Sequence, residues 1–441
     1  MRLAHNALRI TSIANVTTAS PLAPLDSPPE SAAGGLLLAK NAGALFVGQA
    51  VGLVVPLLTI PYLARVLGPS AWGPVLAAQA LGNWLLLVLE FGFELSGTRA
   101  VARARAAPHT MSDVVHGVQS AKAGLVLFAM PIVVIALIAI PAVRQYPVLL
   151  AWTVAFAVLR GFSPLWFFQG IERIRGAVLV DMLSRAAASL GVFVFVHGPG
   201  DGWRVLALQA VFGAVALVVL TAWLVRHVRL RMPTRAAAVE TLRSGASIFA
   251  CRAWSGLYIQ GNALILSALA GPAVVAFFGG AERIIRAAIN LLQPLTQVFL
   301  PRVSYLHAVD QPAAARMIRH ALLGVGLLGV AMGLCGSLGA PFLVHTLLGA
   351  QYGAAVPVLR LMGALPVLVA VNSVLGLYWA LPFGYERWLL GSIIAAGVTN
   401  VGLAVLLVPR WGASGMAASA IVAEVVALVV VGVVYLRSEQ S

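Results

Sequence analysis

Long apolar stretches recur along almost the whole chain and are separated by short polar segments. A helix needs about 20 consecutive apolar residues to cross the hydrocarbon core of a bilayer, and these stretches reach that length. The pattern therefore predicts an all-α, polytopic membrane protein with about twelve transmembrane helices. The predicted spans lie near residues 36–63, 72–97, 114–141, 147–169, 177–197, 203–225, 245–269, 273–300, 315–340, 354–381, 388–408 and 413–436.

Composition supports this class. Of the 441 residues, 61% are hydrophobic and only 10% are charged, and the mean hydropathy is +0.95. Soluble globular domains are about one quarter charged. The sequence therefore indicates an integral membrane protein.

Two pairs of similar segments indicate an internal repeat. Leu67–Trp72 and Ala270–Val275 each lead into a predicted span through a Gly-Pro pair, and Phe168–Arg173 resembles Phe383–Arg387. Six spans restore the starting side of the membrane, so the repeat predicts two parallel six-helix bundles with a site between them. The predicted organisation is a tail at 1–35, an N-terminal bundle at 36–226, a basic cytoplasmic linker at 227–244 and a C-terminal bundle at 245–441.

The first 35 residues are rich in Pro, Ser, Thr and Ala without helical periodicity, which is typical of a disordered tail. A cleaved signal peptide is the alternative, although the apolar run before Ser20 is short and interrupted by polar residues.

Arginine and lysine between the spans predict the orientation, because cytoplasmic loops retain them. With the N-terminus inside, the predicted outer loops carry only Arg65, Arg144, Arg204 and Arg410, and the other loop cations fall on the cytoplasmic side. Both termini are therefore expected in the cytoplasm of a multi-pass membrane protein. The net charge of +15 reflects this cytoplasmic rim, which attracts anionic membrane lipids and does not require nucleic acid.

Cationic side chains inside the spans are the strongest functional signal, because a bare cation in hydrocarbon costs roughly 3 to more than 10 kcal/mol. The sequence places seven of them there: Lys122, Arg160, Arg185, Arg252, Arg283, Arg286 and Arg360. Such residues normally face a bundle interior or a wet cavity, so the sequence predicts a cationic cavity that binds an anion.

Helical spacing separates these cations into two groups. Asp181 lies four residues before Arg185, and Glu282 lies four residues before Arg286, so each pair shares a helix face and is interpreted as structural. The remaining cations are the candidates for substrate contact: Lys122, Arg160, Arg252, Arg283 and Arg360. Pairing across helices with Glu90, Glu94 or Glu424 is the alternative, as is extension of Arg360 toward the membrane surface.

Glu90 and Glu94 lie on one face of the second span. They are candidates for binding a coupling H⁺ or Na⁺, and they are equally suited to be counter-charges for the buried arginines.

Missing motifs narrow the mechanism. The chain has no G-x-x-x-x-G-K-[ST] loop, no H-E-x-x-H and no C-x-x-C, so no ATP site, metal site or other cofactor is predicted. Asp201 is the single acid in the predicted outer loops, which argues against a glycosyltransferase or polymerase acting there. The expected class is a transporter with no catalytic residues, driven by a gradient or a potential.

Particular strings resemble a known family. These are PLLTIPYLARVLGP at 56–69, FGFELSGTR at 91–99, AERI at 281–284 and LPRVS at 300–304. They are similar to the Wzx-type polysaccharide flippases of the multidrug/oligosaccharidyl-lipid/polysaccharide exporter superfamily, and the resemblance runs from about residue 36 to the end.

The resemblance implies two six-helix bundles that move undecaprenyl-pyrophosphate-linked oligosaccharide repeat units across the inner membrane by alternating access. The implied product is a surface polysaccharide such as O-antigen, capsule or exopolysaccharide, and a polysaccharide polymerase is a further implied partner. Guanidinium groups suit a pyrophosphate because they form forked, charge-assisted hydrogen bonds. A flippase for the peptidoglycan lipid precursor and an exporter of small molecules are the alternatives within the superfamily, and a membrane scaffold is the alternative outside transport.

Overall fold

The computed structural model describes residues 32–105 and 107–440, so most of the predicted tail at 1–35 lies outside the described residues. The chain divides into two units between Phe46 and Val47. The helix contacts and the site described below lie within the second unit, Val47–Ser441.

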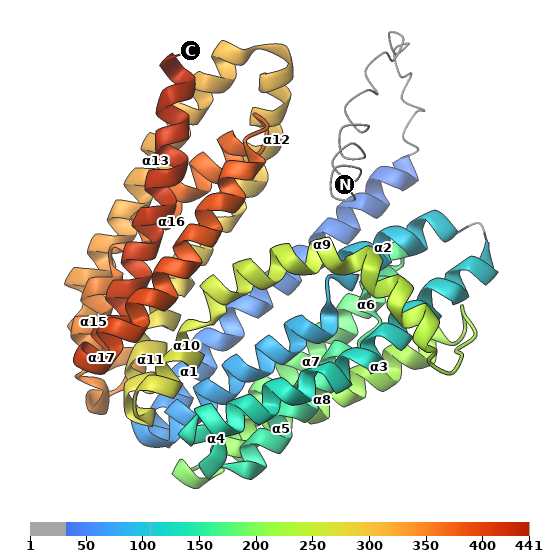
Figure 1. Ribbon diagram of the computed structural model, residues 1–441, viewed down its shortest axis with the longest axis horizontal. Helices are drawn as coiled ribbons and strands as arrows, with labels where there is room; N and C mark the ends of the chain where they lie inside the picture. Colours follow the sequence, from blue (N-terminus) through green and yellow to red (C-terminus); the bar gives the residue numbers. More distant parts are fainter. Residues whose placement is uncertain (1–31, 106, 441) are drawn as a thin grey trace, which may run out of the picture. The chain divides into compact units, whose positions relative to one another are not determined.

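The described part of the chain is helical throughout (Figure 1). The N-terminal half contains α1 (Ala32–Glu90), α2 (Phe93–Ala104), α3 (Pro108–Ala139), α4 (Pro141–Gln145), α5 (Pro147–Gly161), α6 (Leu165–Gly170), α7 (Ile174–Phe195), the short η2 (Pro199–Asp201) and α8 (Gly202–Leu224). The C-terminal half contains α9 (Arg235–Gln260), α10 (Asn262–Leu269), α11 (Pro272–Asn290), α12 (Gln293–Val309), α13 (Gln311–Leu338), α14 (Ala340–Leu343), η3 (Val344–Leu348), η4 (Ala350–Tyr352), α15 (Ala355–Met362), α16 (Leu365–Ser373), η5 (Val374–Ala380) and α17 (Glu386–Gln440).

This architecture confirms the predicted all-α membrane fold. Eight helical segments of the searched residues are long and apolar enough to cross a membrane. Two of the long helices are interrupted by a glycine with non-helical dihedral angles, Gly68 in α1 and Gly412 in α17. The predicted spans are mostly helical, but several of them, such as 72–97, 147–169 and 273–300, contain a break between two helices. The number of membrane crossings stays a prediction.

Glycine and proline explain where the helices break. Gly68 has φ 71° and Gly412 has φ 52°, a region that is open mainly to glycine. Pro164, Pro294 and Pro366 lie at the starts of α6, α12 and α16, because proline supplies no N–H to the preceding turn. Pro131 stays inside α3.

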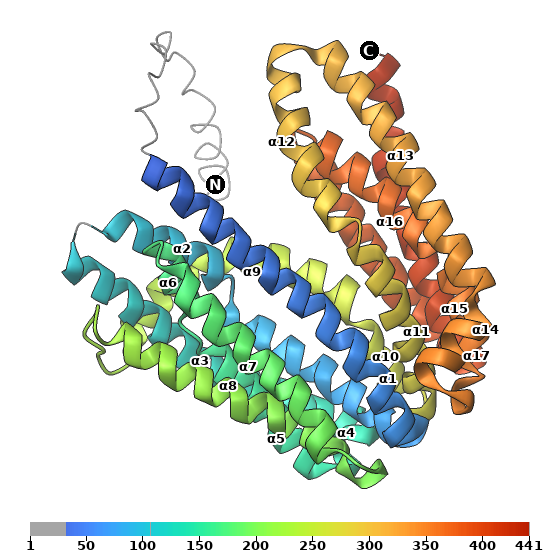
Figure 2. The same cartoon turned by 180° about the vertical axis from the view of Figure 1, so that it is seen from behind.

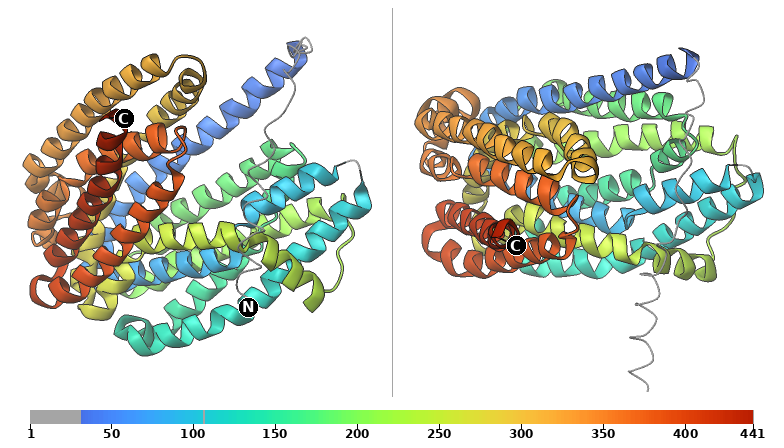
Figure 3. Two further views of the ribbon diagram at one scale, coloured as in Figure 1. Left: turned by 45° about the horizontal axis from the view of Figure 1, so that its top comes forward. Right: turned by 90° about the horizontal axis from the view of Figure 1, so that it is seen from above.

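The helices gather into an N-terminal group, α2 to α8, and a C-terminal group, α12 to α17 (Figure 3). In the first group α8 packs against both α5 and α7. In the second, α13 packs against α16 and α15 (Figure 2). α9 follows the first group in sequence and packs against both α3 and α17.

Small residues allow close helix packing, which membrane helices need because lipid is as apolar as their side chains. A Cβ atom on Gly333 would lie 2.2 Å from the Gly363 carbonyl oxygen, and one on Gly329 would lie 2.8 Å from the Val367 Cα. These two glycines therefore form a close packing face of α13.

The segments that suggested an internal repeat meet in space at one point. Gly73, just after Leu67–Trp72, packs directly on Pro272 at the start of α11, where a Cβ would lie 1.9 Å from the Pro272 carbonyl oxygen. Nearby, Arg65 donates to the Thr346 carbonyl, and the Gln351 amide donates to the Ala64 carbonyl at 3.2 Å. The segment around Gly68 is therefore in contact with α11 and with η3 and η4 of the C-terminal half.

Candidate functional site

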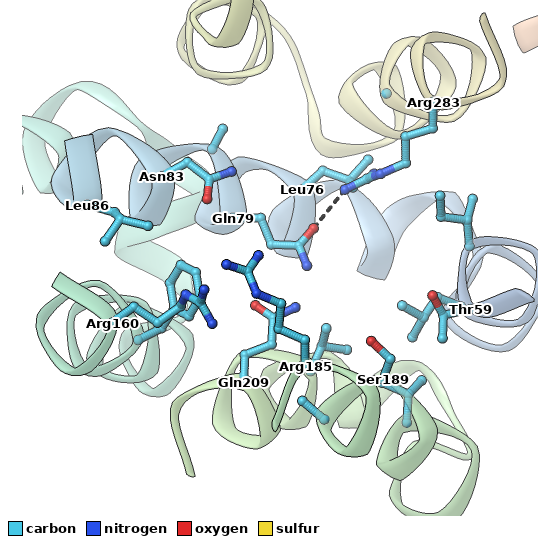
Figure 4. Close-up of a pocket in the computed structure, with 18 of the residues that line it drawn as sticks. Thr59, Leu76, Gln79, Asn83, Leu86, Arg160, Arg185, Ser189, Gln209 and Arg283 are labelled. Atoms are coloured by element: carbon cyan, nitrogen blue, oxygen red, sulfur yellow. Dashed lines mark hydrogen bonds between the residues drawn. The ribbon is translucent and has the colours of Figure 1, made fainter. Parts of the chain in front are cut away.

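A cavity of about 700 Å³ lies among α1, α5, α7, α8, α10 and α11. Its size falls in the range of small-ligand sites. Its polar lining consists of Thr59, Gln79, Asn83, Glu90, Arg160, Ser184, Arg185, Ser189, Gln209, Glu282, Arg283 and Arg286. Figure 4 shows Arg160, Arg185 and Arg283 around the same space, with Arg283 bonded to Gln79. Both halves of the chain contribute, since α11 follows the linker and α1, α5, α7 and α8 precede it.

Arg160 and Arg185 share one carboxylate. Asp181 Oδ1 lies 3.2 Å from Arg160 Nη2, and Asp181 Oδ2 accepts a hydrogen bond from Arg185 Nε at 2.9 Å. The pairing of Asp181 with Arg185 is confirmed, but Asp181 also neutralises Arg160 from the neighbouring helix. The three side chains together carry one excess positive charge next to the cavity.

Arg283 is held by neutral groups. Its Nη2 donates to Gln79 Oε1 at 2.7 Å, and its guanidinium lies 5.3 Å from the centre of the Trp72 ring, within cation–π range. Among the described residues, Arg283 forms no ion pair with a carboxylate. It is therefore the cavity arginine whose charge is least compensated by the protein.

Two carboxylates also line the cavity. Glu282 binds Arg286 at 2.7 Å, as the spacing predicted. Glu90, the last residue of α1, lines the cavity close enough to Arg160 and Lys122 for electrostatic attraction. With Asp181, three carboxylates face four arginines at this site, which leaves it cationic.

The structure separates the predicted site residues. Arg160, Arg283 and Glu90 line the cavity together, whereas Lys122, Arg252, Arg360 and Glu94 are not among its lining residues. Arg252 instead pairs with Glu94 at 2.9 Å, which is the pairing across helices that the sequence left open. Arg160 also pairs across helices, but with Asp181, which the sequence had assigned to Arg185 alone. Arg360 is exposed in the last turn of α15.

Sequence reasoning set aside two arginines that line the cavity. Arg185 and Arg286 were interpreted as structural because each has an acid four residues earlier, yet their side chains are 62% and 42% exposed and reach the cavity. It also missed the amides of Gln79, Asn83 and Gln209. Their signal was present, because Gln79 and Asn83 lie four residues apart in an otherwise apolar stretch.

The arrangement suits an anion that also carries hydroxyl groups. Guanidinium groups offer forked donors to phosphate or carboxylate oxygens, and amide and hydroxyl side chains can bind sugar hydroxyls. No three His, Cys, Asp or Glu side chains gather as a metal site within the described residues.

Comparison with known proteins identifies the family. The profile of the polysaccharide biosynthesis protein family matches residues 38–307, more than half of the chain. The chain belongs to the polysaccharide biosynthesis protein family. The predicted resemblance to Wzx-type flippases is thereby confirmed, and the described cavity lies within the matched region.

Individual relatives agree with this assignment. The chain is 29% identical over 372 residues to a protein of Escherichia coli (strain K12) named "Putative O-antigen transporter", with 83% of this chain and 89% of that protein covered. A protein of the same name from Shigella dysenteriae is 26% identical over 400 residues, with 88% and 97% covered. These relatives are named as transporters and not as enzymes, as expected for this family member.

Solved structures show the same fold. The lipid II flippase MurJ in an inward closed conformation matches with a TM-score of 0.70 at 14% identity, over 91% of this chain and 87% of that one. An outward-facing multidrug resistance transporter of the MATE family and the MOP superfamily matches with a TM-score of 0.55 at 18% identity, over 92% and 96%. This polysaccharide biosynthesis family member therefore has the fold of those flippases and exporters.

Proposed function

We propose that the protein translocates undecaprenyl-pyrophosphate-linked oligosaccharide repeat units across the bacterial inner membrane for synthesis of a surface polysaccharide. The observation that carries the proposal is the cavity with four arginines inside a membrane fold. A pyrophosphate is a compact anion that can offset the excess charge left by the three carboxylates, and the family and its named O-antigen relatives support this substrate class.

We assign the roles by local geometry. Arg283 contacts the pyrophosphate first, because neutral partners leave its charge available. Arg185 adds a second contact from α7, since its guanidinium is exposed and shares its carboxylate with Arg160. Gln79, Asn83 and Gln209 bind the nearest sugar hydroxyls, and the polyprenyl tail stays in lipid beside the helices.

Transport then proceeds by alternating access of the two halves. The site opens toward the cytoplasm, binds the headgroup and reopens outward while both termini remain in the cytoplasm. Counter-transport of H⁺ or Na⁺ supplies the energy, and Glu90 is the better placed of the two predicted coupling carboxylates because it lines the cavity and Glu94 does not.

Complementation in the native host tests the proposal. We expect Arg283→Ala to abolish most surface polysaccharide in a strain that lacks the chromosomal copy. Arg283→Lys should restore part of it, because lysine keeps the positive charge but cannot form the two parallel hydrogen bonds of a guanidinium group. Arg144→Ala is the matched control, since Arg144 is exposed and is not among the residues that line this cavity. Normal polysaccharide on gels from the Arg283→Ala strain, at equal protein level, would contradict the assignment.

A flippase for the peptidoglycan lipid precursor is the alternative, supported by the MurJ fold match. The two substrates share a polyprenyl pyrophosphate and differ in the sugar. Rescue of a strain depleted of its lipid II flippase, without rescue of surface polysaccharide, would favour this alternative. Export of small cationic molecules fits poorly, because the cavity is itself cationic.

A further inference from the structure

Lys122 is the most deeply buried cation of the described chain, and the proposed function gives it no role. Its side chain on α3 is 2% exposed and is not among the residues that line the cavity. Its Nζ donates a hydrogen bond of 2.6 Å to the carbonyl oxygen of Gly161. A lysine that touched the anion directly would have to reach the cavity, so this geometry points to another task.

The Gly161 carbonyl is the last of α5, and the chain beyond it cannot complete the helix. Phe162 donates to the Val158 carbonyl and Ser163 to the Arg160 carbonyl, but Pro164 has no N–H. Backbone carbonyls at a helix C-terminus lack partners within the helix and carry partial negative charge. The buried Lys122 ammonium therefore satisfies the Gly161 carbonyl and offsets the partial negative charge at this end of α5.

The same helix end also packs against α1. A Cβ atom on Gly161 would lie 2.8 Å from Leu89 Cβ, so α5 and α1 are in close contact here. Glu90, next to Leu89, lines the cavity and attracts Lys122 electrostatically. Gly161 thus contacts both α1 and the Lys122 side chain of α3.

Arg160 directly precedes Gly161, so its backbone position depends on this contact. Its guanidinium is fixed separately, by Asp181 on α7 at 3.2 Å. Arg160 is therefore anchored at both ends, with Lys122 holding the backbone and Asp181 holding the side chain.

We infer that Lys122 is a positioning residue, which acts on the anion only through Arg160 and never touches it. The inference rests on the proposed function, because it assigns Lys122 a place in binding a lipid pyrophosphate. It replaces the direct contact that the sequence predicted for this lysine.

A double-mutant cycle tests the inference on the purified full-length protein. The probe is farnesyl diphosphate, and farnesol, which lacks the diphosphate, is the control ligand. We expect Lys122→Met to weaken diphosphate binding about tenfold, the size of one charge-assisted hydrogen bond. Arg160→Ala is expected to weaken it at least as much, and the double variant should bind no more weakly than Arg160→Ala alone.

Rescue and labelling distinguish positioning from contact. Lys122→Arg keeps a cation that can donate to the Gly161 carbonyl, so we expect it to restore most of the affinity. With the two native cysteines, Cys251 and Cys335, replaced by serine, a cysteine introduced by Lys122→Cys should resist a water-soluble thiol reagent. One introduced by Arg185→Cys, in the cavity lining, should react and be protected by farnesyl diphosphate.

Each outcome decides one question. Additive losses in the cycle, or labelling at position 122 that the diphosphate blocks, would overturn the inference and make Lys122 a ligand. If Lys122→Met does not fold, the Lys122→Arg affinity and the labelling pattern decide instead. A wild-type protein that binds farnesyl diphosphate no better than farnesol contradicts the proposed function itself, which is a different failure.

Discussion

One aspartate holds two arginines beside the cavity. Asp181 is almost buried, and its two oxygens bind Arg160 from α5 and Arg185 from its own helix. The two ion pairs differ in exposure, because the Arg160 side chain is 16% exposed and that of Arg185 is 62% exposed. Burial therefore predicts that the Arg160 pair contributes more to stability than the Arg185 pair, although both guanidinium groups line the cavity and can contact an anion.

This difference gives a stability prediction. We expect Arg160→Gln to lower the unfolding free energy by about 3 kcal/mol, because it leaves a buried carboxylate with less compensation. Arg185→Gln should cost less than about 1 kcal/mol, as solvent screens an exposed pair. Unfolding of the purified variants in one detergent measures both changes, and equal losses would contradict the assignment of roles.

A second residue-scale prediction concerns pH. Outside the membrane-spanning segments, Arg105 Nη2 lies 2.8 Å from Glu172 Oε1, and this hydrogen bond lowers the pKa of Glu172 below its ordinary value of 4.5. A lowered folded-state pKa adds stability that is present above the ordinary value and lost as pH falls below it.

The pH is lowered from about 6 to about 3, across the ordinary pKa of a glutamate side chain. Over this range the thermal midpoint of the wild type should fall slightly more than that of Glu172→Gln. Both groups of the pair are on the surface, so the difference is expected to be small. Parallel curves for the two proteins would exclude a contribution from this pair.

Individual cations could be found from the sequence, but their partners could not. Hydropathy identified Arg160 and Arg283 because each interrupts an apolar run. Partners within a helix follow from spacing, as for Asp181 with Arg185, whereas the Arg252–Glu94 pair joins residues 158 positions apart. Such pairs depend on how helices pack, which no local pattern encodes.

At the scale of elements, the contact between α1 and α11 leaves no room for a side chain at Gly73. Alanine normally stabilises a helix by about 1 kcal/mol relative to glycine. We expect Gly73→Ala to do the opposite and lower the thermal midpoint, because its Cβ would meet the Pro272 backbone, which cannot rotate away.

Gly124→Ala is the matched control for that variant. Gly124 lies in α3, is exposed and has no atom within 4 Å of the added Cβ. Its thermal midpoint should rise slightly or stay unchanged. A loss of stability at both positions would show that the effect is not specific to the α1–α11 contact.

Helix ends were easier to predict than helix continuity. The Gly-Pro pair at 271–272 marked the start of α11. The breaks before α6, α12 and α16 fall at prolines inside the spans 147–169, 273–300 and 354–381, which the sequence predicted as continuous. The break between α1 and α2 at Phe91, which has φ 44°, carried no such signal. The glycine that follows, Gly92 with φ 78°, lies inside the predicted span 72–97 and was not interpreted as a break.

At the scale of the whole molecule, the distribution of loop arginines predicts which side faces the cytoplasm. Segments expected outside are brought together in the structure, for example Arg65 with Thr346 and Gln351 with Ala64. Alkaline phosphatase fused after Gln145 should therefore be active, and the same enzyme fused after Met232 should be inactive. The reverse pattern would invert the predicted topology.

The fold class followed from hydropathy because bilayer thickness sets the length of an apolar helix. The cavity did not follow, since it is the space left between helices from distant parts of the chain. Its lining runs from Thr59 to Arg286, across more than half of the sequence. Spacing within one helix predicted a purely structural role for Arg185 and Arg286. In the folded protein, however, both side chains line the cavity.

The arginines of the cavity belong to helices on either side of the linker, with Arg160 and Arg185 before it and Arg283 and Arg286 after it. If the two halves rock apart, the distance between these two groups must grow, and a compact anion can then reach only one of them. The affinity of the cavity for the anion would therefore fall as the two halves separate. Release of the headgroup would then follow from the separation of the arginines, and no further residue would be needed to displace it.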